Sequence, residues 1–203
     1  MNRLAMSVAF GAMMLLFASV SEGAKFRVTL NGANENPATG SPGVGTADVN
    51  YDPVGHTLSV AVNFSGLTAG TTASHIHCCI TVAGGNAGVA TTTPTFAGFP
   101  LTVTAGSYST VLDETQASSW NPSFITANGG TTSSAEAVLA NGMNSGLAYL
   151  NIHTSAFPGG EIRGFLVPET GGTNVPTLSE WALVALAGML AVAVFVTMRR
   201  RAR

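Results

Sequence analysis

The chain has 203 residues, of which 46% are hydrophobic and only 9% charged, and its formal net charge at pH 7 is −2. Between residues 25 and 173 the basic side chains are Lys25, Arg27 and Arg163. Binding to nucleic acid relies on many cations that neutralise phosphates, so this composition argues against a nucleic-acid partner. A segment of roughly 150 residues is long enough for one domain with a hydrophobic core. Abundant Gly, Thr and Ser with few charges are typical of an exported, all-β domain.

Residues 1–24 have the pattern of a secretory signal peptide. Arg3 precedes an apolar run over residues 4–20, and small residues follow it. Cleavage after Ser21 and cleavage after Ala24 are both compatible with this pattern, and an uncleaved signal anchor is the alternative to cleavage. We therefore expect the Sec export machinery to carry the chain out of the cytoplasm.

In the first half of the domain, apolar and polar residues alternate in short runs, which predicts half-buried β-strands. The clearest run covers residues 56–65. The turn-forming residues 52–55 before it predict a hairpin with the preceding strand. The predicted strands of this half are 26–30, 43–51, 56–65 and 74–82.

The second half combines strands with one or two short helices. Asp113 can cap a helix that ends near residue 119, and Ser133 or Ser134 can cap another over about 135–143. The predicted strands are 89–93, 99–103, 108–112, 147–154 and 161–167. Seven to nine short strands with Gly and Pro turns predict an antiparallel β-sandwich or a partly closed barrel over residues 25–168. Residues 169–174 then form a linker.

Three histidines form a candidate metal site. Alternation along the strand 74–82 places His75 and His77 on one face, with their Cα atoms about 7 Å apart. Two imidazoles in this position can chelate zinc or copper. His153 ends another predicted strand, and it joins them if the two strands are neighbours. The candidates for a further ligand are Glu35, Glu161 and Cys79. The alternative is a structural polar network at the end of a sheet.

The remaining polar groups allow several interpretations. Cys78 and Cys79 are adjacent, so they are compatible with two free thiols, a vicinal disulfide or a bond to another chain. Glu161 and Arg163 share one face of the last predicted strand, which predicts an ion pair or a satisfied polar cluster, and docking of Arg163 on Glu35 is the alternative. The sequence contains no Gly-x-Ser-x-Gly nucleophile motif, so we expect a protein that is not an enzyme.

The C-terminal segment, residues 175–203, has three features in a fixed order. An uncharged run over residues 181–198 is about 18 residues long, which is enough for a transmembrane helix in contact with lipid. A basic cluster follows it and predicts a cytoplasmic C-terminus. That cluster consists of Arg199, Arg200, Arg201 and Arg203. The motif before the run is Val175, Pro176, Thr177, Leu178, Ser179, Glu180 and Trp181.

This arrangement resembles the IPTL-CTERM class of bacterial sorting signals, which are relatives of the PEP-CTERM tails. The resemblance implies an exosortase-type membrane protease as a partner. Val175 stands where the family has Ile, and Ala182 stands where Gly is usual. An unprocessed membrane anchor is the alternative. The resemblance places the protein in the cytoplasmic membrane before processing, and afterwards at the cell surface or in the extracellular matrix.

The domain itself resembles the CHRD domain, a module named from chordin. The resemblance is carried by residues 30–37, by His75-Ile76-His77, by residues 149–154 and by residues 158–164. It implies an exported β-domain without defining an activity. Cys78-Cys79 follows His77 where the family has a Gly-rich stretch. The histidine strand is also similar to the copper strand of Cu/Zn superoxide dismutases, although that site uses more histidines than the 4 of this chain.

These observations predict an exported, surface-sorted protein with a structural, adhesive or ligand-binding role at the bacterial envelope or in the extracellular matrix. The alternative is a metal-binding protein or a superoxide-dismutase-like redox enzyme that uses His75, His77 and His153. The sequence does not identify a surface ligand.

Overall fold

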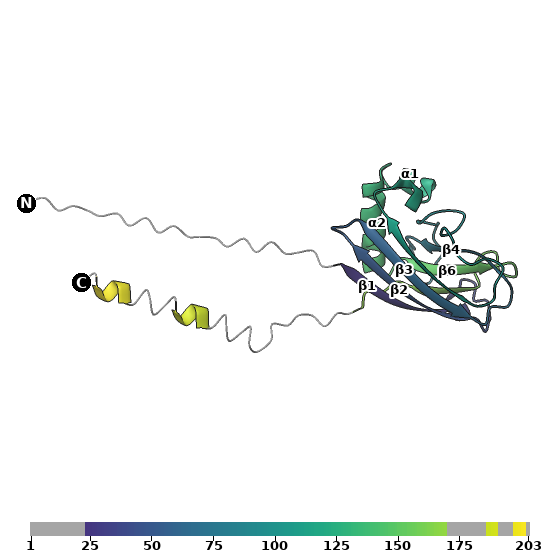
Figure 1. Ribbon diagram of the computed structural model, residues 1–203, viewed down its shortest axis with the longest axis horizontal. Coiled ribbons are helices and arrows are strands. Elements are labelled where there is room, and N and C mark those ends of the chain that lie inside the picture. Colours follow the sequence, from purple (N-terminus) through teal and green to yellow (C-terminus); the bar gives the residue numbers. More distant parts are fainter. Residues whose placement is uncertain (1–22, 170–185, 191–196, 202–203) are drawn as a thin grey trace, which may run out of the picture.

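The computed structural model describes residues 23–169, 186–190 and 197–201 (Figure 1). In this part of the chain a 7-stranded antiparallel sheet has the order β4-β6-β7-β1-β2-β3-β5. Its strands are β1 (Ala24–Asn31), β2 (Val44–Asp52), β3 (Thr57–Ser65), β4 (Thr71–His77), β5 (Gly106–Asp113), β6 (Tyr149–Thr154) and β7 (Ile162–Phe165). The fold is mostly β, as predicted. Because the strands form one sheet and not two, the sandwich alternative is wrong.

The predicted export and sorting segments lie largely outside the described residues. The signal peptide, 1–24, is described only from residue 23, and the sorting motif, 175–181, is not described. The described parts of the predicted transmembrane and basic segments, 186–190 and 197–201, are helical. Among all described residues, no helix is both long and apolar enough to cross a membrane. β1 begins at Ala24, so cleavage after Ser21 leaves this strand complete, whereas cleavage after Ala24 removes its first residue.

The predicted hairpin between the second and third strands is confirmed. β2 and β3 pair from Val44↔Ser65 to Asp52↔Thr57. At the turn, the carboxylate of Asp52 accepts the backbone N–H groups of Val54 and Gly55, so the side chain satisfies donors that the tight turn leaves free. Local turn chemistry and alternation are therefore sufficient to specify this part of the sheet.

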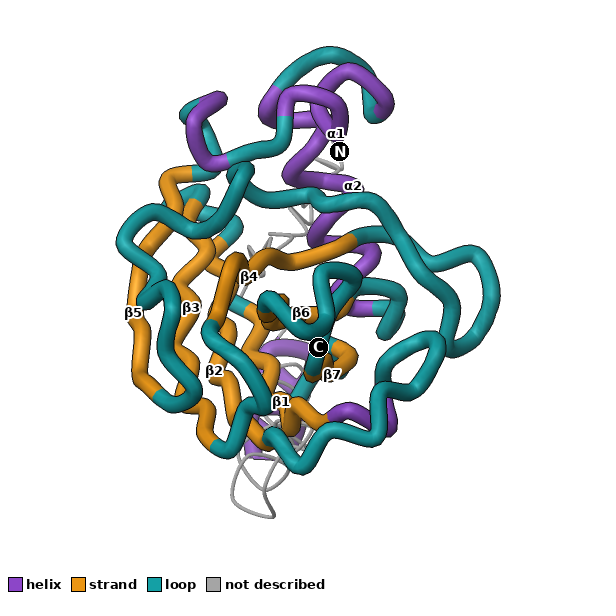
Figure 2. The backbone as a smooth tube through the Cα atoms, turned by 90° about the vertical axis from the view of Figure 1, so that its right-hand side faces the viewer, coloured by secondary structure: helices purple, strands orange, loops and turns teal. Residues whose placement is uncertain are grey.

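The sheet curves into a half-barrel (Figure 2). Its edge strands are β4 and β5, and the irregular segment 89–104 runs along the edge of β4. Backbone N–H groups of Ala90 and Phe96 donate to the carbonyls of Ile76 and Ser74, and the ring of Phe96 stacks on Tyr108 of β5 with centroids 6.0 Å apart. The segment thus covers a strand edge that would otherwise be available for pairing with another chain.

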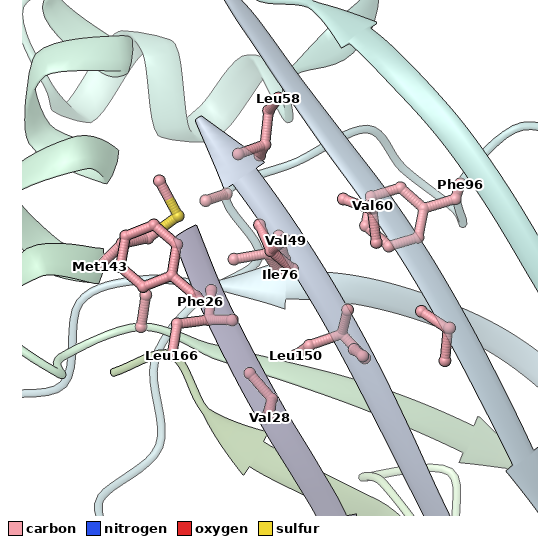
Figure 3. Close-up of a cluster of buried hydrophobic side chains, with 14 of the residues drawn as sticks. Phe26, Val28, Val49, Leu58, Val60, Ile76, Phe96, Met143, Leu150 and Leu166 are labelled. Atoms are coloured by element: carbon pink, nitrogen blue, oxygen red, sulfur yellow. The ribbon is translucent and has the colours of Figure 1, made fainter. Parts of the chain in front are cut away.

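The core lies on the concave face of the half-barrel. Apolar side chains from opposite strands meet there, including Phe26, Val49, Leu58 and Leu150, and Met143 from a helix packs against them (Figure 3). Burial of each such side chain stabilises the fold by about 1.5–3 kcal/mol. The inward set follows the predicted period of two, so the other face of β4, β6 and β7 is left for polar groups.

The helices lie at one end of the sheet (Figure 1). α2 (Thr132–Asn144) confirms the predicted helix over 135–143 and begins earlier, since Thr131 and Ser134 form a capping box. The helix predicted after Asp113 is wrong, because only the 3₁₀ turn η2 (Ala117–Ser119) forms there. α1 (Pro122–Ala127) was not predicted, although the side chain of Asn121 caps it and proline occupies its first position.

Two further strand predictions are wrong. Residues 89–93 and 99–103 form no strand, and only single-residue bridges occur at Val89 and Thr91. The predicted strand 74–82 is observed as β4, which begins at Thr71 and ends at His77. It ends there because its partner β6 (Tyr149–Thr154) begins at Tyr149, the residue that pairs with His77. The start of a strand far along the chain therefore stops a strand that the alternation would continue.

A second cluster of titratable groups fastens α2 to the sheet. Glu136 on α2 accepts the hydroxyl of Tyr51 at 2.9 Å, and His56 Nδ1 lies 2.9 Å from its other carboxylate oxygen. Glu114 is buried nearby, and burial together with the charge of Glu136 raises the pKa of Glu114 to about 8. The fourth histidine, His56, therefore serves helix docking and lies apart from His75, His77 and His153.

Candidate metal centre

The neighbouring strands β4 and β6 bring the three predicted histidines together. Their register pairs Ala73 with His153 and His77 with Tyr149. Because side chains alternate between the two faces of a strand, the imidazoles share the outer face while Ile76 points into the core. The condition that the two histidine strands be neighbours is thus met.

The three imidazoles are close enough to share one ion. Each offers one ligand atom, and these atoms all lie within 4.8 Å of one another. His75 Nδ1 and His153 Nε2 are 3.3 Å apart. Zinc bound tetrahedrally by nitrogens at about 2.0–2.1 Å separates its ligands by about 3.3–3.4 Å. At least one edge of the cluster therefore already has the spacing of a zinc site.

Backbone carbonyls fix the tautomer of each ring. His77 Nδ1 lies 2.9 Å from the carbonyl of Ala87, and His153 Nδ1 lies 2.8 Å from that of Pro158. His75 uses Nε2 to reach the carbonyl of Pro94. A carbonyl only accepts hydrogen bonds, so each of these nitrogens carries the proton.

The other three nitrogens carry lone pairs. They are His75 Nδ1, His77 Nε2 and His153 Nε2. Two lone pairs cannot hydrogen-bond to each other, so the close approach of His75 Nδ1 to His153 Nε2 calls for a cation between them. His77 Nε2 is buried and has no hydrogen-bond partner among the described residues. A ligating histidine typically donates its other N–H to a carbonyl or carboxylate, and all three rings here do so.

Burial keeps the three rings neutral. Burial is the main reason why the pKa values of His75, His77 and His153 are lowered from the ordinary value of histidine. It brings the pKa of His77 to about 4. The neighbouring histidines lower the pKa values of His75 and His77 further, because two adjacent imidazolium ions repel each other. Neutral imidazole is the form that binds metal, so at pH 7 no proton competes for the lone pairs.

Tyr149 supports His77. The two rings stack with centroids 4.8 Å apart and planes 5° from parallel. The hydroxyl of Tyr149 accepts the N–H of Ala87 at 3.2 Å, and the carbonyl of the same residue orients His77. The guanidinium of Arg163 on β7 lies 4.6 Å from the centroid of the Tyr149 ring, a cation–π contact.

Arg163 organises the loops that cover this face. Only 1% of Arg163 is exposed. Its guanidinium donates to the carbonyl of Asn34 in η1 (Gly32–Asn34) and, across the loop 84–86, to the carbonyl of Gly84 at 2.9 Å and to Asn86 Oδ1 at 2.8 Å. The loop 84–86 leads directly to Ala87, the acceptor for His77. In the sequence, the sign of this role is that Arg163 is isolated in a domain with few cations. Its hydrogen-bond acceptors lie in loops far from it along the chain, so the sequence does not identify them.

Glu161 and Arg163 form no ion pair with each other. Glu161 lies instead in a satisfied polar cluster, as the second interpretation of this strand predicted, and Arg163 docks on Glu35. Arg163 Nε lies 3.7 Å from the carboxylate of Glu35. Burial raises the pKa of Glu35 to about 7, although the positive charge of Arg163 opposes this shift. Glu161 precedes β7 and instead accepts hydrogen bonds from the backbone of Thr68 and the hydroxyl of Thr154, both at 2.6 Å.

The three candidates for a further ligand are engaged elsewhere. Cys79 is bonded to Cys78 in a vicinal disulfide, which selects one of the three alternatives for this pair. Glu161 is held by Thr68 and Thr154, and Glu35 contacts Arg163 and accepts the side-chain amide of Asn151 at 2.8 Å. The cluster in the described chain therefore consists of the three histidines alone. Such a set leaves a coordination position for water or an external ligand.

The fold and this cluster define a class of protein: an antiparallel half-barrel domain that carries a buried histidine triad on its outer face. The CHRD domain family matches residues 26–166, and the IPTL-CTERM motif matches residues 173–201. The chain belongs to the CHRD domain family, and both resemblances are confirmed. A search of curated proteins finds no match to this chain. A search of solved structures finds none either.

Proposed function

We propose that this protein is an exported, surface-sorted CHRD-domain protein that binds one zinc or copper ion through His75, His77 and His153. The observation that carries the proposal is the set of three neutral imidazoles, each with one N–H held by a backbone carbonyl and with one ring nitrogen of each within 4.8 Å of the others. Imidazole ligands favour zinc and copper over magnesium and calcium, which prefer oxygen.

Binding, and not catalysis, is the role we propose for the ion. The described part of the chain contains one group of three clustered metal-ligating residues, and the fourth histidine, His56, contacts Glu136. The open coordination position suits a ligand supplied by the envelope or the extracellular matrix, so the domain has a structural, adhesive or ligand-binding role there. A superoxide-dismutase-like activity is the alternative.

Metal binding is tested by titrating the protein, isolated in the form that the cell exports, with Zn²⁺ or Cu²⁺ at pH 7. We expect one ion per chain and a higher midpoint of thermal unfolding, because a ligand that binds only the folded state stabilises it. Mg²⁺ serves as the control and leaves the midpoint unchanged. A protein that retains no metal above background and shows no thermal shift with either ion contradicts the proposal.

We further propose that an exosortase-type membrane protease removes the C-terminal tail. Loss of the tail releases the protein from the cytoplasmic membrane, so that it reaches the cell surface. The match to the IPTL-CTERM motif over residues 173–201 supports this step. Mass spectrometry of the mature protein is expected to show a chain that lacks residues 181–203. In cells without the protease, the intact tail should accumulate in the membrane fraction. An intact tail on all mature protein of normal cells indicates a permanent anchor instead.

A further inference from the structure

The disulfide between Cys78 and Cys79 directly follows the metal-binding strand. Its two cysteines are one residue apart in sequence. A disulfide stabilises a fold mainly by closing a long loop in the unfolded chain, and the stabilisation grows with the length of that loop. A bond between neighbours closes no such loop. Its role must therefore lie in the chemistry of the two sulfurs and not in cross-linking distant parts of the domain.

The two cysteines line a pocket of about 370 Å³ between the end of β4 and the helices. Val89, Phe124 and Val138 form its apolar wall, and no charged side chain of the described chain lines it. Cys78 is buried, whereas Cys79 is half-buried. Cys79 is therefore the more accessible of the two cysteines to an external thiol that enters the pocket.

The two side-chain amides that line the pocket are already hydrogen-bonded. The side-chain amide of Asn121 donates to the carbonyl of Val89 at 2.9 Å, and that of Asn128 donates to the carbonyl of Phe124 at 2.8 Å. The disulfide is therefore the reactive group that the pocket presents to solvent.

The disulfide and the histidine cluster share their supports. His77 and Cys78 are consecutive residues, and they are held by the consecutive carbonyls of Ala87 and Gly88 at 2.9 and 3.1 Å. On the other side, both sulfurs lie against the backbone of α2 at Gly142, where even a methyl group would collide with them. Two unbonded sulfurs with their hydrogens need more room than a bonded pair. Reduction must therefore displace residues 78–79 from α2, and His77 moves with them.

We propose that Cys78–Cys79 is a redox-active disulfide, that a thiol compound reduces it through this pocket, and that its reduction weakens metal binding by the adjacent histidines. The second half of this proposal rests on the proposed metal function.

The redox step is a thiol–disulfide exchange. The thiolate of an external thiol attacks Cys79 Sγ, and the electron pair of the broken S–S bond passes to Cys78 Sγ, which takes up a proton. A second external thiolate attacks the external sulfur of the mixed disulfide, so that Cys79 leaves as a thiolate and is protonated. In total, two thiols are oxidised to one external disulfide, and the protein disulfide is reduced to two thiols.

The redox claim is tested on the protein produced from the full chain and isolated in its exported form. It is incubated with reduced glutathione without denaturant, alkylated and analysed by mass spectrometry. We expect two alkylated cysteines per chain, while thermal unfolding remains cooperative. The double variant Cys78→Ala/Cys79→Ala incorporates no alkyl group and serves as the control. If alkylation of the wild-type protein requires denaturant, the disulfide is inert and the proposal is overturned.

The coupling claim is tested on the wild-type protein alone, because a pair of alanines is smaller than the disulfide and does not reproduce the crowding by two thiols. The protein is titrated with Zn²⁺ before and after reduction by a phosphine. We expect the dissociation constant of the reduced protein to be at least about tenfold higher than that of the oxidised protein, within the range found when a group that supports a ligand is lost. As a second measurement, saturating Zn²⁺ should shift the reduction equilibrium of the disulfide by the same factor, because linkage is reciprocal.

The outcomes of the two experiments are separable. Equal zinc affinity of the oxidised and the reduced protein, together with no effect of zinc on reduction, overturns the coupling. If the wild-type protein binds no zinc, the coupling fails together with the metal function. The number of cysteines alkylated without denaturant still decides whether the disulfide is redox-active.

Discussion

Replacing His77 by alanine is expected to raise the dissociation constant for zinc or copper by at least about 100-fold. Loss of a residue that supports a metal ligand typically weakens metal binding by about 10- to 100-fold. Loss of a ligand itself should reach at least the upper figure. Isothermal titration calorimetry at pH 7 measures the change. The ring of His77 contributes a buried nitrogen without a hydrogen-bond partner among the described residues, so no other interaction retains its lone pair.

The matched control is His56→Ala, which also removes one imidazole. His56 contacts Glu136 and is not part of the cluster of His75, His77 and His153, so this variant should bind metal with the affinity of the wild-type protein. Unchanged affinity in His77→Ala, or an equal loss in both variants, contradicts a specific site at His75, His77 and His153. Both variants are first compared by thermal unfolding, so that a loss of folding is not mistaken for a loss of ligation.

Replacing Arg163 by methionine is expected to lower the free energy of unfolding by about 3–5 kcal/mol, the usual cost of breaking a buried ion pair. The change removes the side-chain donor to the carbonyls of Asn34 and Gly85 and leaves Glu35 without its cation. Urea unfolding at pH 7 measures the loss. Because the loop 84–86 then loses its anchor, metal affinity should fall as well.

The matched control is Arg27→Met on β1. Arg27 pairs with Asp48 at 2.8 Å, but their side chains are 70% and 54% exposed, so this pair should contribute only about 0–1 kcal/mol. Arg163→Lys should not restore stability, since one ammonium group cannot reproduce the fork of the guanidinium. Equal losses in Arg163→Met and Arg27→Met would show that Arg163 does not organise the covering loops.

The destabilisation by Arg163→Met should depend on pH in a defined direction. Burial raises the pKa of Glu35 to about 7 in the folded protein, and Arg163 opposes this shift. Without Arg163 this pKa rises further. A carboxyl group whose pKa is raised in the folded state binds more protons folded than unfolded, so it costs stability as the pH rises. The difference between variant and wild type should therefore widen above pH 7.

Much of the central sheet was predictable because its information is local. The alternation in residues 57–65 and the Asp52 turn specify β2, β3 and the hairpin between them without help from the rest of the chain. The helix α1 was predictable in principle, since Asn121 and Pro122 are ordinary helix-start residues. By contrast, Ile80 and Val82 continue the alternation of β4, and the strand ends at His77 because its partner β6 begins at Tyr149, opposite His77.

The candidate site divides in the same way. The spacing of His75 and His77 determines that they share one face of a strand, because side chains alternate in any extended chain. That His153 joins them depends on the placement of β6 beside β4, which is a property of the whole sheet. The tautomers depend on the carbonyls of Pro94, Ala87 and Pro158, which lie in loops brought over this face by tertiary folding.

The sequence by itself determined the family, the β-class of the domain, the sorting motif and the shared face of His75 and His77, because each depends on residues close together in the chain. Only the tertiary structure decided that the sheet is single, that Arg163 meets Glu35, and that three lone pairs gather in one cluster. Those features depend on residues that are far apart in sequence, and only the folded sheet with its covering loops brings these residues close together.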